Sequence, residues 1–212
     1  MRKVLIFLLC ITVFSNCVYA KNKLSSTAQS LERRGYVNIQ TLNKSIFVSL
    51  MYSRADNFTG TVLYDDLKEA YLHPNAANAL IKAQKRLKQL RPDLSLKVYD
   101  AARPISVQQK MWNKMKHTSK RHYVSNPAHG GGLHNYGLAV DLTLCTLKGD
   151  TIPMGTKIDY MGKTAVSHKA LRNRQLLSGV MRYAGFMPLH GEWWHFNYCS
   201  RAYAIKHYKL IK

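Results

Sequence analysis

The order of apolar and polar residues first predicts a helix and a strand in the middle of the chain. A helical period runs from Pro74, a favoured first-turn residue, to the position before Pro92, which cannot continue a helix. The apolar positions of this period share one helical face: Ala76, Ala79, Leu80, Ala83, Leu87 and Leu90. Apolar residues then alternate with other residues, as in a strand, at Leu94, Leu96 and Val98.

A second helix and a second strand are expected farther along the chain. Ser106 is a suitable N-cap for this helix, because its side chain can accept a hydrogen bond from a backbone amide of the first turn. The inward side chains of the helix are Val107, Met111 and Met115. Glycines 130–132 then form a flexible lead into a strand at residues 137–144.

A third helix is predicted over residues 169–184, with Gly185 as its C-terminal stop, and a last strand over residues 193–198. Helices and strands are mixed without βαβ alternation, and no repeat or Pro/Gly-rich linker divides the chain. The pattern predicts a single α+β domain over residues 35–212, with a mostly antiparallel sheet and flanking helices. Residues 21–34 form a polar N-terminal segment, and we expect 21–30 to be loosely held.

The first twenty residues have the layout of a secretory signal peptide. Two basic residues precede an apolar run at 4–14, and residues 18–20 offer a small-residue cleavage site. The run is shorter than the roughly 20 apolar residues that a transmembrane helix needs. An uncleaved anchor, a buried helix and a lipid on Cys17 are the alternatives. The sequence predicts an exported protein, with the periplasm as its compartment.

The chain is strongly basic. Its formal charge of +21 falls to +19 without residues 1–20, which contain two basic residues and no acid. The basic residues are scattered rather than set in a nucleic-acid-binding motif, so we expect no nucleic acid as partner. They predict a general affinity for anionic cell-wall polymers or lipid. Cys145 and Cys199 remain after cleavage, and export permits a disulfide; the sequence leaves a pair and two free thiols both open.

One acid stands alone in the apolar strand predicted at residues 137–144. An acid in such a stretch has to be paired, ligated or exposed, and this one is Asp141. His134 lies seven residues earlier, and Gly137 between them can let the chain turn so that both side chains converge. Such a pair is a candidate metal site, although a histidine and an aspartate at this spacing also occur by chance.

A second unusual stretch, GEWWHF at residues 191–196, places a glutamate and a histidine in a dense aromatic run. Taken alone, His195 can be a core histidine. Together with the two residues above, it completes a set of two histidines and one aspartate, which leaves tetrahedral zinc one open position. Glu192 is then the candidate general base and acid. Strict alternation puts it opposite His195, so it has to lie at the mouth of the strand.

An arginine and a proline follow the strand that contains Val98. Pro104 keeps Arg103 out of helical geometry, so its planar guanidinium can be aimed at a developing oxyanion or a substrate carboxylate. A surface arginine in a turn is the alternative interpretation.

With these segments in order, the chain resembles the D-alanyl-D-alanine dipeptidase family, zinc peptidases of the hedgehog/DD-peptidase fold. Residues 132–141 (GLHNYGLAVD) are similar to the family pattern S-x-H-x-x-G-x-A-x-D, and residues 192–195 (EWWH) to its E-x-W-H. Arg103 and Pro104 match its arginine-proline turn, and residues 153–161 resemble the segment before its late helix. The resemblance covers about residues 35–200.

The resemblance implies hydrolysis of D-alanyl-D-alanine to two D-alanines in cell-wall peptide metabolism. It implies Glu192 as the general base and acid, and Arg103 as the residue that stabilises the tetrahedral intermediate. It places Asp159 where an acid holds the free ammonium of the substrate, which would restrict the enzyme to dipeptides. One zinc ion is implied, with these ligands: His134, Asp141 and His195.

Two departures from the family concern the range of substrates. Gly132 replaces the serine that opens the pattern, so a hydroxyl near the amino end of the substrate is missing unless another residue supplies it. The segment between Pro104 and His134 is also short for the family. A D,D- or L,D-carboxypeptidase or endopeptidase acting on longer peptidoglycan stem peptides is therefore an alternative. A zinc-binding module without catalysis is another, although such a protein would usually lack Glu192 or Arg103.

Overall fold

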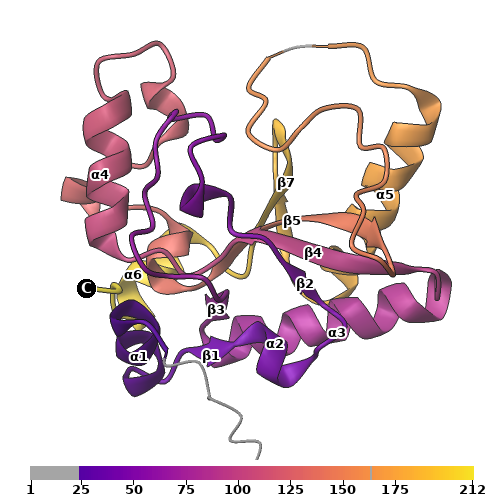
Figure 1. The fold of residues 1–212 in the computed structure, drawn as a ribbon, viewed down its shortest axis with the longest axis horizontal. Helices are drawn as coiled ribbons and strands as arrows, with labels where there is room; N and C mark the ends of the chain where they lie inside the picture. The colour runs from indigo at the N-terminus through magenta and orange to yellow at the C-terminus, as the bar shows by residue number, and fades with distance from the viewer. Residues whose placement is uncertain (1–23, 163) are drawn as a thin grey trace, which may run out of the picture.

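The computed structural model describes residues 24–162 and 164–212 (Figure 1). The predicted signal peptide, residues 1–20, lies outside this part. No helix of the described residues is long and apolar enough to span a bilayer.

Helices and strands are mixed along the chain. The strands are β1 (Val37–Asn38), β2 (Phe47–Val48), β3 (Tyr71–Leu72), β4 (Leu94–Asp100), β5 (Ala139–Thr146), β6 (Met187–Leu189) and β7 (Glu192–Asn197). The α-helices are α1 (Ser26–Arg33), α2 (Ile39–Leu42), α3 (Pro74–Leu90), α4 (Ile105–Met115), α5 (His168–Tyr183) and α6 (Arg201–His207). Short 3-10 helices are η1 (Met51–Ser53), η2 (Arg121–Tyr123), η3 (Pro127–His129) and η4 (Leu133–Tyr136).

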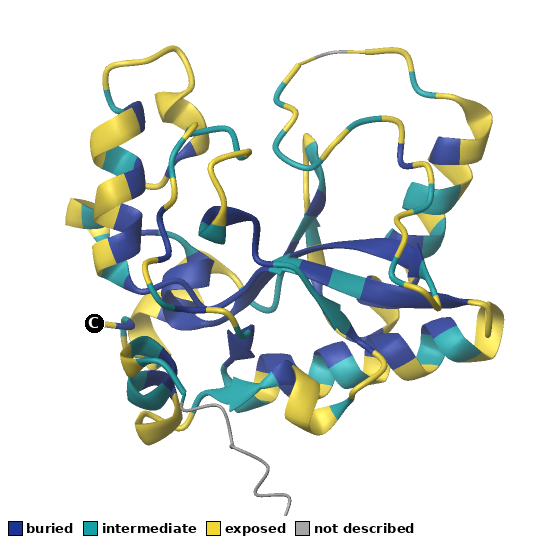
Figure 2. Ribbon diagram, viewed as in Figure 1, coloured by how far each residue is buried: buried dark blue, intermediate teal, exposed yellow. Residues whose placement is uncertain are grey.

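The main sheet has the strand order β2-β4-β5-β7-β6. Only β2 and β4 run parallel in it; the other neighbours are antiparallel. A small antiparallel sheet joins β1 and β3. Helices α3 and α5 pack against each other and against the main sheet, so β4 and β5 lie in the core (Figures 1 and 2). The prediction of an α+β domain with a mostly antiparallel sheet is confirmed.

The predicted helix at residue 74 matches α3, with one difference at its end. The helical face that contains Leu80 and Leu87 is fully buried against the sheet. Leu90 is 47% exposed, because it is the last residue of the helix and lies beyond the sheet that covers the preceding turns.

One predicted helix start is wrong by two residues, and the start predicted at about residue 169 agrees with the structure to one residue. Helix α4 begins at Ile105 with Pro104 as its N-cap, so Ser106 lies inside the first turn and does not cap the helix. Helix α5 begins at His168, because the hydroxyl of Ser167 accepts a hydrogen bond from the amide of Ala170.

The expectation of a loosely held N-terminal segment is wrong from residue 26 onward. Helix α1 is capped by the hydroxyl of Ser25, and its side chains Ala28 and Leu31 are buried in the core. Two apolar residues three positions apart are enough to fix one face of a helix. The polar residues around them dominate the composition and conceal this face.

The cysteines settle one alternative. Cys145 is buried on β5 and Cys199 is half-buried after β7, and both are free. The possibility of a disulfide between them is therefore not realised in this structure.

Candidate metal centre

Strand register brings two of the candidate metal ligands together. Asp141 on β5 and His195 on β7 are direct cross-strand partners. His134 comes from η4, and Gly137 ends that turn with a left-handed backbone, φ +67°. A Cβ on Gly137 would lie 2.5 Å from the ring of Tyr36, so only glycine fits this turn.

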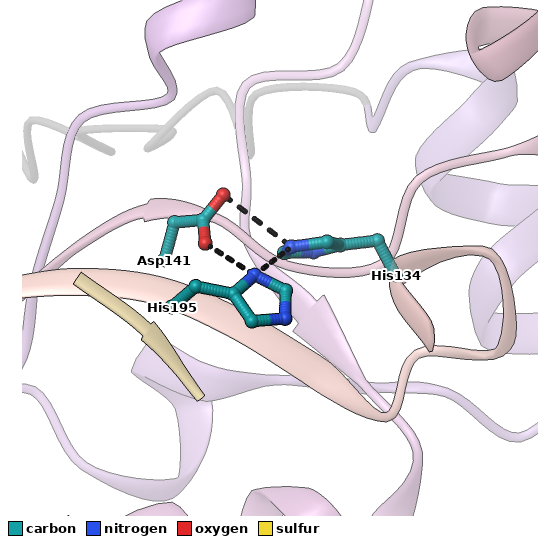
Figure 3. Close-up of side chains that lie close together, drawn as sticks. All are labelled: His134, Asp141 and His195. Atoms are coloured by element: carbon teal, nitrogen blue, oxygen red, sulfur yellow. Dashed lines mark hydrogen bonds and ion pairs between the residues drawn. The ribbon is translucent and has the colours of Figure 1, made fainter. Parts of the chain in front are cut away.

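The three side chains point at one another (Figure 3). Nε2 of His134 lies 3.3 Å from Oδ2 of Asp141 and 3.3 Å from Nδ1 of His195. Nδ1 of His195 lies 2.9 Å from Oδ1 of Asp141. In a tetrahedral zinc site with metal–ligand distances of about 2.0–2.2 Å, neighbouring ligand atoms lie about 3.3–3.6 Å apart, close to the spacing found here. The donor set and its spacing therefore fit a tetrahedral cation with one further position for water or substrate.

The other nitrogen of each imidazole is also engaged. Nδ1–H of His134 donates to the carbonyl oxygen of Ala101 at 2.8 Å. Nε2–H of His195 donates to Oδ1 of Asn197 at 2.8 Å. Each ring is thus held in the tautomer whose lone pair faces Asp141, the arrangement that orients imidazole ligands in metal sites.

Burial and charge oppose each other at these groups. Burial by itself raises the pKa of Asp141, but the charges and hydrogen bonds of His134 and His195 outweigh it and hold that pKa well below its usual range. Burial lowers the pKa of His195, and the hydrogen bond and charge of Asp141 more than compensate, so the pKa is raised.

Glu192 is the first residue of β7 and lies beyond the part of the strand that pairs with β5. That pairing covers residues 195–197 only. Glu192 is instead opposite Leu189 of β6, after a shift in register. At this position strand alternation no longer fixes the direction of its side chain, and the carboxyl group lines the same cavity as His195. Burial raises the pKa of Glu192 above its ordinary value.

The cavity has a volume of about 270 Å³. All the residues singled out in the sequence line it: Arg103, His134, Asp141, Asp159, Glu192 and His195. They come from β5, β7, η4, the β4–α4 turn and the loop before α5, so the fold brings together segments that are far apart in the chain.

Arg103 is buried, with 7% of its surface exposed, which rules out the alternative of a surface arginine. Its Nε and Nη2 donate to Asp100, and its Nη1 donates to Oε1 of Gln108 at 2.9 Å. The guanidinium carbon lies 4.9 Å from the ring centre of Tyr52. Nη1 also donates to Sδ of Met111 at 3.5 Å, so of the five N–H groups of the arginine only one, on Nη2, is left without a protein partner.

A bulge in β4 explains why Asp100 reaches Arg103. The register shifts between Val98, which faces Leu142, and Asp100, which faces Asp141. The extra residue turns Asp100 toward the site. Oδ1 of Asp100 accepts a hydrogen bond of 2.5 Å from the hydroxyl of Tyr64, so the buried carboxylate is fully paired.

Asp159 is a non-glycine residue with a left-handed backbone, φ +61°. Its Oδ2 accepts a hydrogen bond of 3.0 Å from the hydroxyl of Tyr52. Burial raises the pKa of Asp159 to about 7, and the negative charge of Asp141 adds to the shift. A cation in the cavity would favour the ionised form of Asp159.

Sequence reasoning missed four residues that hold the site together: Tyr52, Asp100, Gln108 and Asn197. Asn197 could have been identified from the sequence, because it lies two residues after His195 and therefore on the same face of the strand. Asp100 could also have been identified from the sequence, because it is an acid at the end of an apolar strand. Nothing near Tyr52 or Gln108 in the sequence indicated a role.

Comparisons with known proteins agree with this geometry. The family described as D-Ala-D-Ala dipeptidase matches residues 32–212. A D-alanyl-D-alanine dipeptidase of Escherichia coli (strain K12) is 34% identical over 167 residues, which cover 76% of this chain and 83% of the relative. One of Synechocystis sp. (strain ATCC 27184 / PCC 6803 / Kazusa) is 25% identical over 178 residues, 63% of this chain and 71% of the relative. The chain belongs to the D-Ala-D-Ala dipeptidase family of metallopeptidases.

Proposed function

We propose that this protein hydrolyses D-alanyl-D-alanine to two molecules of D-alanine and that its metal is zinc. The observation that carries the proposal is the donor set of His134, Asp141 and His195, whose spacing of 2.9–3.3 Å fits tetrahedral zinc beside Glu192 in one small cavity. The names of the two relatives supply the substrate.

The cation, when bound, supplies Lewis-acid polarisation of the scissile carbonyl and makes a water molecule more acidic. Glu192 takes the proton of the attacking water as the new C–O bond forms. It then gives this proton to the nitrogen of the leaving D-alanine as the C–N bond breaks. Its raised pKa suits both tasks, because a carboxyl group that accepts and returns a proton works best near the operating pH.

Arg103 stabilises the oxygen that gains negative charge. Its contacts with Asp100, Gln108 and Met111 hold the guanidinium rigidly in the lining of the cavity and leave one N–H group of Nη2 without a protein partner. Rigid donors of this kind need no reorganisation when charge develops, which is the basis of oxyanion stabilisation.

Two features support a dipeptide as substrate. The cavity of about 270 Å³ is near the lower end of the range of about 300–1,000 Å³ for ligand pockets. Asp159, held by Tyr52, offers a charge partner for a free ammonium group, which an internal residue of a longer peptide lacks. The hydroxyl of Tyr123 also donates to the carbonyl of Met161 at 3.2 Å, so two loops meet beside the cavity.

A second candidate is a carboxypeptidase or endopeptidase acting on longer stem peptides. A separate hollow of about 650 Å³ favours it, because that hollow is lined by Trp193 and Ile158, the chain neighbours of Glu192 and Asp159. A longer peptide that left the cavity along these neighbours would find room there.

The place of action that we propose is the periplasm, with peptidoglycan-derived peptides as the source of substrate. The support is the signal-peptide pattern of residues 1–20, together with a formal charge of +19 for the remainder, which suits contact with anionic polymers or lipid of the cell envelope.

The test is product analysis of the zinc-loaded protein with free D-Ala-D-Ala and, in parallel, with a pentapeptide stem ending in D-Ala-D-Ala. Release of D-alanine from the dipeptide alone supports a dipeptidase and the ammonium role of Asp159. Cleavage of the pentapeptide alone overturns both and favours the second candidate. The Glu192→Gln variant is the matched control, since it keeps the size of the side chain.

A further inference from the structure

The position of Gly132 shows an unexpected relation to a serine seven residues earlier. A Cβ built on Gly132 would lie 2.8 Å from Oγ and 3.4 Å from Cβ of Ser125. Real Cβ atoms essentially never approach another atom so closely. The Ser125 hydroxyl therefore occupies the space that a Cβ at position 132 would enter, and this exposed side chain would have to rotate away to admit one. Both residues line the cavity of the metal site.

The backbone of Ser125 is tied to the catalytic arginine through one buried side chain. Nε2 of Gln108 donates to the carbonyl oxygen of Ser125 at 2.8 Å, and Oε1 of Gln108 accepts from Nη1 of Arg103 at 2.9 Å. Gln108 is only 1% exposed. Ser125 is thus held at a fixed place relative to Arg103. Its own hydroxyl has no hydrogen-bond partner among residues 24–162 and 164–212, so it is free to bind a ligand.

A positive charge lies beside the same glycine run. Nε of Arg201 donates to the carbonyl of Gly131 at 3.0 Å, and its Nη2 donates to the carbonyl of His129. Arg201 also lines the cavity, and its Nη1 makes no hydrogen bond within the described part of the chain. The lining therefore has an arginine and a free hydroxyl at the glycine run, and a carboxyl group at Asp159 on a different loop.

A free dipeptide carries the complementary pair of charges. In an extended dipeptide the terminal ammonium and carboxylate lie about 7 Å apart, since each residue spans about 3.3–3.6 Å. If the ammonium of the substrate binds to Asp159, its carboxylate lies at the other end of the molecule. Arg201 and the Ser125 hydroxyl are the positive and hydrogen-bond-donating groups that can bind this carboxylate.

We propose that Ser125 is a specificity-determining residue that donates a hydrogen bond to the carboxylate of the dipeptide, with Arg201 supplying the attractive charge. This inference rests on the proposed function. Positions 125 and 132 share one volume, so Ser125 supplies a hydroxyl where Gly132 has no side chain. We assign this hydroxyl to the carboxylate end of the substrate, and not to the amino end expected from the sequence, because Arg201 lies beside it and Asp159 is the partner proposed for the ammonium.

The experiment compares four zinc-loaded proteins: the wild type, Ser125→Ala, Gly132→Ser and the exchange Ser125→Gly with Gly132→Ser. Each is assayed with D-Ala-D-Ala and with D-alanyl-D-alaninamide, which lacks the carboxylate charge. Zinc content and thermal midpoint verify that each variant is folded.

We expect Ser125→Ala to raise KM for D-Ala-D-Ala about tenfold with kcat within twofold, because a hydrogen bond to a charged group is lost. The loss should be less than threefold for the amide. Gly132→Ser alone should also raise KM for D-Ala-D-Ala, because the Ser125 hydroxyl has to rotate away from its place in the cavity. The exchange should regain a KM within about threefold of the wild type, because the hydroxyl returns to the same volume.

An unchanged KM in Ser125→Ala, or an equal loss on both substrates, would overturn the proposal. If the wild type does not hydrolyse D-Ala-D-Ala, the proposed function fails and the role of Ser125 is decided by binding alone. Calorimetric titration of D-Ala-D-Ala into Glu192→Gln, with and without Ser125→Ala, then measures it. A tenfold weaker dissociation constant supports the role, and equal constants exclude it.

Discussion

Two parts of the cavity are built in different ways. The candidate metal ligands His134, Asp141 and His195, which we call the cavity floor, are fixed by strand register and by a hydrogen bond behind each imidazole. The residues Ser125, Asp159 and Arg201, which we call the cavity rim, belong to loops or to the first turn of a short helix. In the proposed function the floor carries the reaction, and in the further inference the rim contacts the ends of the substrate. The difference shows how one rigid site for chemistry can be combined with loops that select the substrate.

The largest effect is expected from Glu192→Gln. Loss of the group that accepts and returns the proton should lower kcat by about 10³-fold to 10⁴-fold, since general acid–base catalysis contributes factors of this size. Zinc content, measured by metal analysis, should stay at one ion per chain because Glu192 is not a ligand. Turnover within tenfold of the wild type would contradict the role given to Glu192.

Arg103→Lys should reduce kcat by about 10²-fold with a smaller change in KM, because the planar fork that faces the developing charge is lost. Lysine keeps a positive charge beside the buried Asp100, so the comparison is not dominated by an unpaired carboxylate. Steady-state kinetics with a thermal-melting control separates the two effects. A rise in KM with unchanged kcat would show that Arg103 acts in substrate binding and not in the chemical step.

Asn197→Ala tests whether the floor depends on its supporting hydrogen bonds. The variant removes the acceptor for Nε2–H of His195, and we expect zinc affinity to fall about tenfold to a hundredfold. Competition with a chelator gives the dissociation constant. A matched change on the rim, Ser125→Ala, should leave zinc affinity unchanged. An equal loss of zinc affinity in both variants would contradict the separate roles given to the floor and the rim.

The smallest effect concerns Asp159 and pH in the metal-free protein. Its pKa is about 7 in the folded state, mainly because of burial, and about 3.9 in the unfolded chain. Between these values the folded protein binds more protons than the unfolded chain, so stability falls as pH rises through this window. Asp159→Asn should melt several degrees higher than the wild type at pH 8, because each kcal/mol shifts the midpoint by about 2–4 °C in a domain of this size, and close to it at pH 4. A lower melting temperature of Asp159→Asn than of the wild type at pH 8 would contradict a raised pKa of the buried Asp159 carboxyl group.

Particular residues show how far the sequence leads. The apolar periods at 74–90 and 139–146 predicted α3 and β5 with small errors at their ends, because burial of one face or of a whole strand leaves a regular pattern. The start of α4 and the burial of α1 were missed, since a cap depends on backbone geometry and two apolar residues give too weak a period. Tyr52 and Gln108 were missed because their partners lie on segments that only the fold brings near.

By itself, the sequence determined the fold class, the kind of chemistry and the candidate ligands, because these depend on residue types and on short motifs, each confined to its own segment of the chain. Only the tertiary structure decided where the side chains meet. Pairing of β5 with β7 set Asp141 against His195, and the bulge at Asp100 aimed the acid that holds Arg103. The contact of Ser125 with Gly132 is likewise a matter of packing, since two loop residues can exclude each other from one volume only after the chain has folded.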